Sequence, residues 1–200
     1  GTTYGNNKDE VTFHDYEKML NRVFSECYRV LENNGKIVIE VADSILIDKN
    51  YVQLANMVQN ICLKLGYFIC ERHINFVKSE HGVLAPDHDW NNNFYTSNNS
   101  HSNCHHWLVF TKTKTKFNNG KIFYLDYKES KEHPCPFPAE ICKTILDMYF
   151  KKGFTVLDPF MGTATIGIDV ISRGGIFGGF EIDTDIYNTA EKKLKTAIIN

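Results

Sequence analysis

The stretch VLDPFMGTATIGIDVISRGGIFGGFEID, residues 156–183, contains the pattern that decides the fold. A short apolar strand ends in Asp158, and Gly162 permits a sharp turn with a close backbone approach. A helix and a second strand follow, and the second strand ends in Glu181, about twenty residues after the turn. This order of strand, glycine turn, helix and acid-tipped strand is typical of an α/β unit that binds a nucleoside at the carboxyl ends of its strands.

The residues of the turn indicate which nucleoside ligand fits. The turn lacks the G-x-G-x-x-G pattern that a pyrophosphate needs, and Asp158 would repel phosphate groups but suit a cation. S-adenosylmethionine carries an ammonium group, a sulfonium group and a ribose, whose hydroxyls Glu181 could bind. Thr163 and Thr165 lead into a helix whose first N–H groups are free. The alternative is that Asp158 only caps the turn and Glu181 is a solvated strand end.

The rest of the chain alternates between helical and extended patterns. Apolar spacing predicts helices over residues 12–31, 51–65, 139–152, 164–173 and from 184 onward. Apolar and β-branched runs predict strands over residues 36–41, 67–77, 107–116, 121–127, 154–157 and 176–181, with a turn at 118–120. Strands that alternate with helices favour a parallel α/β sheet with helices on both faces.

Composition limits the class of protein. The 200 residues are 42% hydrophobic and 23% charged, which is typical of one globular domain, or two at most. The net charge of -2 gives no global positive field, so any nucleic-acid surface must be a local patch. No apolar run reaches the length of a membrane helix, and GTTYGNNKDE has no signal-peptide core. Six cysteines without paired spacing suit free thiols, so we expect a cytoplasmic protein.

Three motifs together resemble a known family. DPFMGTATIG followed by GFEID, and preceded by HPCPFPAEIC at residues 133–142, resembles the amino-group DNA methyltransferases of bacterial restriction–modification systems. The order resembles the circularly permuted (beta-type) group, in which the catalytic half precedes the cofactor half. Residues 13–43 and the segment CHHWLVFTK extend the resemblance over nearly the whole chain. It implies a Rossmann-like methyltransferase fold, with a mostly parallel sheet, one antiparallel strand and helices on both faces.

The resemblance implies an activity and a set of cofactor-binding residues. The activity is transfer of a methyl group from S-adenosylmethionine to the N4 amine of cytosine or the N6 amine of adenine in double-stranded DNA, with the target base flipped out. The residues implied to bind the cofactor are Asp158, Pro159, Phe160, Gly162, Thr163, Thr165, Glu181, His133, Pro134, Phe137 and Pro138. The chain departs from the family at Ala164, where Gly is usual, and at 104–106, where His-Glu-Tyr is usual.

The same resemblance implies a division of the chain. Residues 1–130 correspond to the catalytic half, with a variable Asn-rich stretch at 78–104 and a short candidate target-recognition segment at 112–130. Residues 131–200 correspond to the cofactor-binding half, and together the halves form one domain. The Pro-Pro-Tyr catalytic loop of the family is absent from these residues and would lie just before Gly1. We therefore expect a fragment, and no catalytic residue is named.

Two segments are candidates for contact with DNA. Lys112, Lys114 and Lys116 alternate along the strand predicted over 107–116, which would place three ammonium groups on one face. They would either contact phosphates or protect an edge strand against aggregation. The Asn-rich stretch contains Trp90, Phe94 and Tyr95, which could stack on bases, or it is an insertion without a role.

Two other chemistries fit less well. Cys135 follows Pro134, as the nucleophile of C5-cytosine methyltransferases follows a proline, but here the order of the motifs is reversed and the spacing between them is short. His101, Cys104, His105 and His106 lack paired ligand spacing, and adjacent histidines point to opposite strand faces, so we predict no metal site.

Other roles stay open. The protein could methylate RNA or another amine, or be a non-catalytic cofactor-binding subunit with a companion chain. A restriction endonuclease is a further possible partner, and a membrane partner is not expected.

Overall fold

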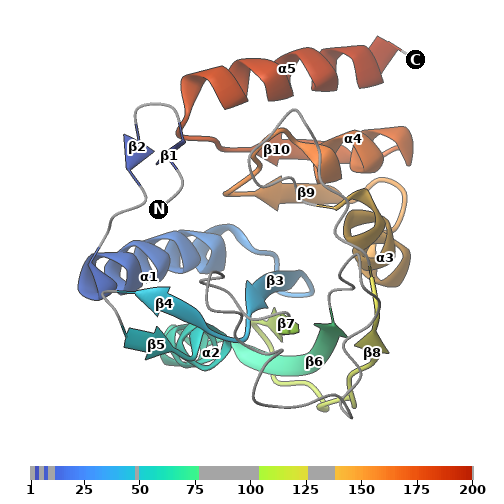
Figure 1. Cartoon of the computed structure of the whole chain (residues 1–200). Coiled ribbons are helices and arrows are strands. Elements are labelled where there is room, and N and C mark those ends of the chain that lie inside the picture. The colour runs from blue at the N-terminus through green and yellow to red at the C-terminus, as the bar shows by residue number, and fades with distance from the viewer. Residues whose placement is uncertain are drawn as a thin grey trace. The chain divides into compact units, whose positions relative to one another are not determined.

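The computed structural model describes residues 3–4, 7–8, 12–47, 50–76, 104–125 and 138–199 (Figure 1). These residues fall into two compact units. One comprises Val11–Leu125, and the other comprises Gly1–Glu10 with Asp126–Asn200. Among the described helices, none is both long and apolar enough to cross a membrane.

A four-stranded sheet forms the centre of the Val11–Leu125 unit. Its spatial order is β3, β7, β6, β8, with bounds Lys36–Ala42, Cys104–Thr111, Phe68–Phe76 and Ile122–Phe123. The central strand β7 is antiparallel to both β3 and β6, whereas the short β8 is parallel to β6. A separate hairpin joins β4 (Ile45–Ile47) to β5 (Asn50–Val52).

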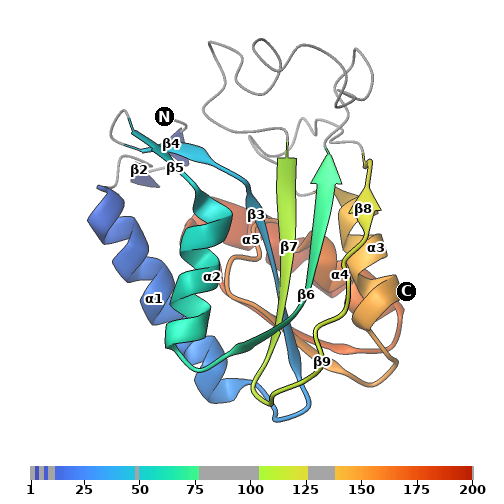
Figure 2. The same ribbon diagram turned by 90° about the horizontal axis from the view of Figure 1, so that it is seen from below.

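Two helices, α1 (Phe13–Val30) and α2 (Leu54–Lys64), lie side by side along this sheet (Figure 2). Their apolar side chains pack against β3 and β7 in a core that contains Leu20, Phe24, Ile39, Val58, Ile61, Cys62, Leu108 and Phe110. The backbone N–H of Asp15 donates to the Thr12 hydroxyl (3.2 Å), so Thr12 caps the first helix. Burial of these side chains is the main stabilising contribution in this unit.

The segment after β7 differs from the prediction. The strand predicted through Lys116 ends at Thr111, whose hydroxyl donates to the carbonyl of Thr113 (2.8 Å). The residues predicted as a turn at 118–120 instead run along the edge of β6, where the Asn118 N–H donates to the Cys70 carbonyl (2.9 Å). A Cβ on Gly120 would lie 1.6 Å from the Arg72 carbonyl oxygen, so this glycine permits a close approach.

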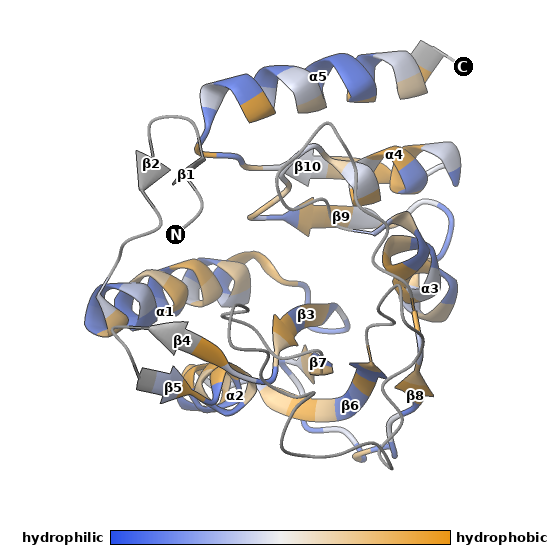
Figure 3. Ribbon diagram, in the orientation of Figure 1, coloured by the Kyte–Doolittle hydropathy of each residue, from blue (hydrophilic) through white to orange (hydrophobic). Residues whose placement is uncertain are grey.

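The second unit contains the only parallel pair of longer strands among the described residues. Strand β9 (Thr155–Asp158) pairs with β10 (Ile176–Gly179) in parallel. Its remaining elements are β1 (Thr3–Tyr4), β2 (Asn7–Lys8), α3 (Ala139–Tyr149), α4 (Thr165–Ser172) and α5 (Thr184–Ile199). Met161, Ala164 and Ala190 form a small core beside the ring of Phe177. Figure 3 shows α5 mostly in hydrophilic colours.

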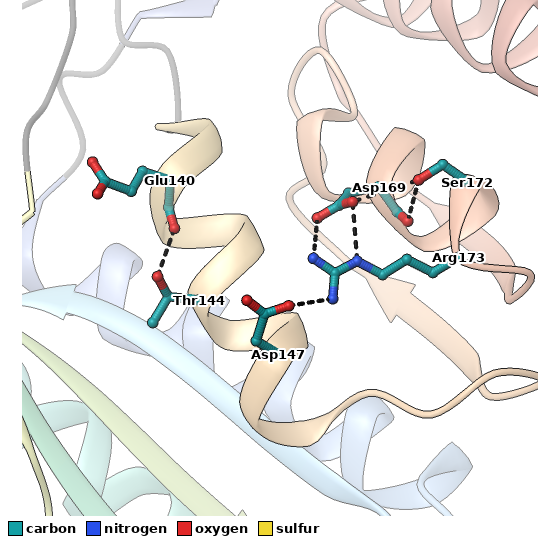
Figure 4. A network of polar contacts seen from close by, with 6 residues as sticks. All are labelled: Glu140, Thr144, Asp147, Asp169, Ser172 and Arg173. Atoms are coloured by element: carbon teal, nitrogen blue, oxygen red, sulfur yellow. Dashed lines mark hydrogen bonds and ion pairs between the residues drawn. The ribbon is translucent and has the colours of Figure 1, made fainter.

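Charged side chains join α3 to α4 at the surface (Figure 4). The Arg173 guanidinium donates to Asp147 of α3 (2.6 Å) and to both carboxylate oxygens of Asp169 (3.0 and 3.1 Å). Because these groups are partly exposed, the network contributes only modestly to stability.

Most predicted elements are present, with different limits. The helix predicted from residue 51 begins at Leu54, because Asn50–Val52 pairs with β4 instead. The extended stretch predicted over 121–127 contains only the two-residue β8 within the described residues. The fold is α/β as predicted: in the four-stranded sheet β3, β6 and β8 run in one direction, β7 is the antiparallel strand, and β9 and β10 form a parallel pair.

Candidate functional site

The carboxyl ends of β9 and β10 bring the two predicted acids together. Asp158 is the last residue of β9 and pairs in register with Gly179, and Glu181 lies two residues beyond Gly179. The N–H of Phe180 donates to the Asp158 carbonyl (3.0 Å), which continues the pairing past the strand end. The sequence therefore predicted this juxtaposition correctly.

Backbone N–H groups fix both carboxylates. Glu181 accepts from the N–H of Gly162 (3.1 Å) through Oε2 and from the N–H of Asp183 (2.9 Å) through Oε1. Asp158 Oδ1 accepts from the N–H of Phe160 (2.9 Å). Asp158 thus caps the turn, which is the role that the alternative without a ligand gives it, whereas Glu181 is held by two backbone N–H groups and is not simply a solvated strand end. Each carboxylate oxygen has a second lone pair, so these bonds leave capacity to bind a ligand.

Burial acts on the charge of Asp158. It raises the pKa of this carboxyl above its usual value; the Phe160 N–H opposes the shift and the nearby Glu181 charge adds to it. A cation placed beside the two acids would favour the ionised form, whereas a phosphate would be repelled. The electrostatics of this strand end therefore favour a positively charged ligand.

The turn between the acids has an unusual backbone. Gly162 has a φ of 51°, and a Cβ added there would meet no atom within 4 Å. The fully buried Ala164 also adopts a left-handed conformation, with φ 59° and ψ 36°, immediately before α4. The methyl group of Ala164 therefore makes this conformation less favourable than glycine would.

Other predicted turn residues lie around this strand end. Pro159 and Phe160 follow Asp158, and the Phe160 side chain is 52% exposed. Thr163 is half-buried, and Thr165 is the first residue of α4.

Sequence reasoning missed two neighbours of Glu181. Ile182 is 84% exposed, which is the highest exposure of any large apolar side chain in the described part of the chain. Asp183 is buried and accepts from the N–H groups of Asp185 (2.9 Å) and Ile186 (3.0 Å), so it caps α5. An acid directly before a helix, as Asp183 is before Thr184, is a capping signal that can be recognised in the sequence.

The proline-rich segment is described only at its end. His133, Pro134, Cys135 and Phe137 lie outside the described residues. Pro138 is buried at the start of α3, where its carbonyl accepts from the N–H groups of Ile141 (3.1 Å) and Cys142 (3.2 Å). Burial raises the pKa of Cys142 to about 12, so this thiol stays protonated.

The three lysines do not form the predicted strand face, because β7 ends before them. The Lys112 ammonium lies 5.0 Å from the ring centroid of Tyr28, in a cation–π contact. Lys114 and Lys116 are exposed in irregular chain. The prediction of a regular stripe of ammonium groups was wrong.

His105 and His106 point to opposite faces of β7, as predicted. His105 pairs with Glu40 of β3, and His106 Nε2 lies 2.9 Å from Asp43 Oδ1, just beyond β3. Within the described ranges, no group of three or more His, Cys, Asp or Glu side chains is arranged to hold a metal ion. His101 and the aromatic residues of the Asn-rich stretch lie outside those ranges.

Solved structures with the same fold include DNA methyltransferases. TTHA0409 from Thermus thermophilus, assigned as a DNA modification methylase and crystallised with S-adenosyl-L-methionine, matches with a TM-score of 0.71 at 19% identity, over 93% of this chain and 79% of that one. The cytosine-N4-specific PvuII DNA methyltransferase matches with a TM-score of 0.66 at 15% identity, over 97% and 83%. The fold is therefore that of the S-adenosylmethionine-dependent methyltransferases.

Sequence comparison identifies the family. Residues 2–192 match the DNA methylase family of N6- and N4-methyltransferases, and the chain belongs to that family. The type II methyltransferase M.BglI of Bacillus subtilis is 25% identical over 135 residues, which are 59% of this chain and 39% of that protein. M.MthZI of Methanothermobacter thermautotrophicus is 28% identical over 74 residues, or 37% and 21%. The chain thus spans less than half the length of these curated relatives.

Proposed function

We propose that the protein transfers a methyl group from S-adenosylmethionine to the exocyclic amine of cytosine (N4) or adenine (N6) in DNA. One observation carries this proposal: in a chain of the DNA methylase family, Asp158 and Glu181 meet at the carboxyl ends of two parallel strands. Because a cation beside the partly buried Asp158 stabilises its ionised form, the site favours a nucleoside that carries a sulfonium group over a dinucleotide or a nucleoside triphosphate, whose phosphates are negative.

The cofactor would use both acids and the exposed side chain beside them. Glu181, already oriented by two backbone N–H groups, would accept from the ribose hydroxyls. Asp158 would lie near the positive charges of the methionine part, and Pro138 would flank it. Ile182 would supply apolar surface for the adenine ring. The space beside Gly162 would let the ligand approach the backbone.

The chemical step follows from the substrates. The amine nitrogen attacks the sulfonium methyl in line, the carbon–sulfur bond breaks, and S-adenosylhomocysteine leaves as the amine loses a proton. The reaction needs no covalent enzyme intermediate, so positioning and charge complementarity supply the catalysis. Lys114 and Lys116 would contribute phosphate contacts, although not as a strand-borne stripe.

Calorimetry with S-adenosylhomocysteine tests the cofactor site in the full-length gene product. We expect Asp158→Asn and Glu181→Gln each to weaken binding about tenfold or more, because each loses a charged hydrogen-bond acceptor. Glu191→Gln is the matched control, since Glu191 is a partly exposed acid of α5 in the same unit. Unchanged affinity in both site variants would refute the assignment.

A methyl-transfer assay tests the activity itself. The protein is incubated with labelled cofactor and with double-stranded DNA or RNA of the same sequence, and the products are digested to nucleosides. Mass spectrometry then distinguishes N4-methylcytosine from N6-methyladenine. Methylated RNA with unmodified DNA would replace the proposed substrate, and cofactor binding without any transfer would indicate a non-catalytic subunit.

A further inference from the structure

A chain of polar contacts ends on an exposed carboxylate in the Val11–Leu125 unit. Gln59 of α2 accepts from Arg72 of β6 (Oε1 to Nη1, 3.4 Å), and Arg72 Nε donates to His106 Nδ1 of β7 (3.3 Å). His106 Nε2 then contacts Asp43 Oδ1 (2.9 Å), just beyond β3. Side chains from three elements, α2, β6 and β7, thus form a continuous chain of contacts that ends on Asp43.

The contacts define the protonation state of His106. Because Arg72 donates to Nδ1, that nitrogen is the acceptor, and the proton lies on Nε2 and is donated to Asp43. Burial lowers the pKa of His106 below its usual value; the hydrogen bond to Asp43 opposes this shift, and the charge of Arg72 adds to it. A neutral imidazole therefore orients Asp43 without cancelling its negative charge.

Asp43 has unused capacity to accept hydrogen bonds. Its side chain is 43% exposed, and among the described residues its carboxylate hydrogen-bonds only to His106. Its backbone is fixed, since its N–H donates to the Cys104 carbonyl (2.8 Å). The second oxygen, Oδ2, is thus held in a defined position and faces no described donor.

Asp43 lies at the edge of the sheet where a substrate is expected to bind. Strands β3 and β6 both run antiparallel to β7, so their carboxyl ends lie at the same edge of the sheet. Asp43, which follows β3, therefore lies at this edge. Ligands of α/β sheets bind at the carboxyl ends of strands.

The chemistry of DNA limits what an acid at this edge can contact. Phosphates repel a carboxylate, so an acid in a DNA-binding surface is favourable only where it meets a donor. The exocyclic amino groups of the bases are the strongest such donors, and Asp accepts from them.

We propose that Asp43, oriented by His106, Arg72 and Gln59, accepts a hydrogen bond from the exocyclic amino group of a DNA base. This inference rests on the proposed function, because it assigns the substrate contact of the same reaction. His106 and Arg72 are positioning residues that act through Asp43. The amine belongs either to the base that is methylated or to a neighbouring base of the recognition sequence.

Asp43→Asn separates this role from a purely structural one. The amide oxygen still accepts from His106 Nε2, so the contact network and the fold are kept. The amide NH2 replaces Oδ2 and presents donors where the base amine needs an acceptor. Glu26→Gln is the control, because Glu26 is an exposed acid of α1 in the same unit, paired only with Arg29 among the described residues.

The experiment uses the full-length gene product and a duplex library with randomised sequence. We expect Asp43→Asn to lower kcat/KM on DNA about tenfold, with the urea midpoint and the affinity for S-adenosylhomocysteine unchanged. A target-base contact lowers the rate equally at all sites, whereas a neighbouring-base contact changes the sequence preference at one position. Asp43→Glu is expected to recover part of the activity, and His106→Asn to give a smaller loss than Asp43→Asn.

Two results have different consequences. Wild-type kinetics and sequence preference in Asp43→Asn would overturn this inference and leave the proposed function intact. Fluorescence anisotropy measures the affinity of wild-type protein and Asp43→Asn for DNA, and it applies where no methyl transfer is found. If the wild-type protein neither binds S-adenosylhomocysteine nor transfers methyl groups, the proposed function fails, while DNA binding that still weakens in Asp43→Asn would keep the base contact.

Discussion

The two acidic sites of this molecule are held in opposite ways. In the C-terminal unit, backbone N–H groups within a few residues of the strand ends fix Asp158 and Glu181. In the Val11–Leu125 unit, side chains from β6, β7 and α2 fix Asp43. The first site depends on a local turn, and the second depends on the register of a whole sheet.

This difference determines which changes damage each site. Side-chain substitutions around the turn leave its backbone hydrogen bonds in place, so the turn is sensitive mainly to residues with special φ angles. The Asp43 network is sensitive to anything that moves β6 against β7, including changes far from Asp43. The predictions below test this contrast.

Gly120→Ala should have the largest effect. A Cβ there would lie 1.6 Å from the Arg72 carbonyl oxygen, and backbone cannot move aside cheaply, so we expect a loss of about 3 kcal/mol in the free energy of unfolding. Hydrogen exchange should show lost protection in β6 and β8 but not in the turn that carries Asp158. Gly153→Ala is the control, since its Cβ would meet nothing within 4 Å, and its positive φ predicts only about 1 kcal/mol. Equal losses in both variants would contradict the close-approach argument.

Stability should fall as the pH falls below 6.5, because of two buried histidines. Burial lowers the pKa of His106, whose nearby charged or titratable groups are Asp43, Arg72 and His105, and the pKa of His73, whose nearby groups are Glu71, Lys121 and Lys36. The unfolded chain takes up protons near pH 6.5 while the folded chain does not. The unfolded state therefore binds more protons, and acid lowers the free energy of unfolding by at most about 1.4 kcal/mol per pH unit for each histidine.

Urea unfolding between pH 7 and 5 measures this effect. The double variant His73→Asn, His106→Asn should have a flatter profile in that range. An unchanged slope would show that the pKa values of these histidines do not differ between the folded and the unfolded chain.

Gly162→Ala tests the turn directly. Its φ of 51° predicts a loss of about 1 kcal/mol in the free energy of unfolding, with no steric clash. The added methyl group would also enter the space assigned to the cofactor, so the affinity for S-adenosylhomocysteine should fall by more than the loss of stability explains. Calorimetry measures the affinity and urea unfolding measures the stability of the same preparation. An unaltered affinity would show that the cofactor does not bind beside Gly162.

Ala164→Gly should have the smallest effect, and its sign is opposite. Glycine relieves about 1–2 kcal/mol of left-handed strain but removes a buried methyl group worth about 0.8 kcal/mol. We expect a net gain of about 0.5 kcal/mol, measured as a higher urea midpoint. A clear loss would mean that the methyl contacts in the Met161–Ala190 core outweigh the backbone preference.

Local signals explain which features the sequence predicted. Asp158, Gly162 and Glu181 belong to one strand–turn–helix–strand unit, so their spacing along the chain was sufficient to predict that the two acids lie together. Long-range pairing explains what was missed. The partners of His106 depend on how β6 aligns with β7, and an irregularity between Ile69 and Glu71 shifts that alignment. The alternation of threonine and lysine also predicted that the strand continues to Lys116. It ends at Thr111 instead, where the hydroxyl donates to the carbonyl of Thr113 two residues further on.

The contact between Gly120 and the Arg72 backbone has a consequence for how variants of this protein should be read. Gly120 lies 48 positions from Arg72 along the chain and belongs to neither acidic site, yet the carbonyl it touches belongs to the residue that orients His106. A substitution at this codon would mimic loss of a substrate contact in a functional screen. Screens for inactive variants should therefore measure folding alongside activity before any such position is assigned a role in recognition.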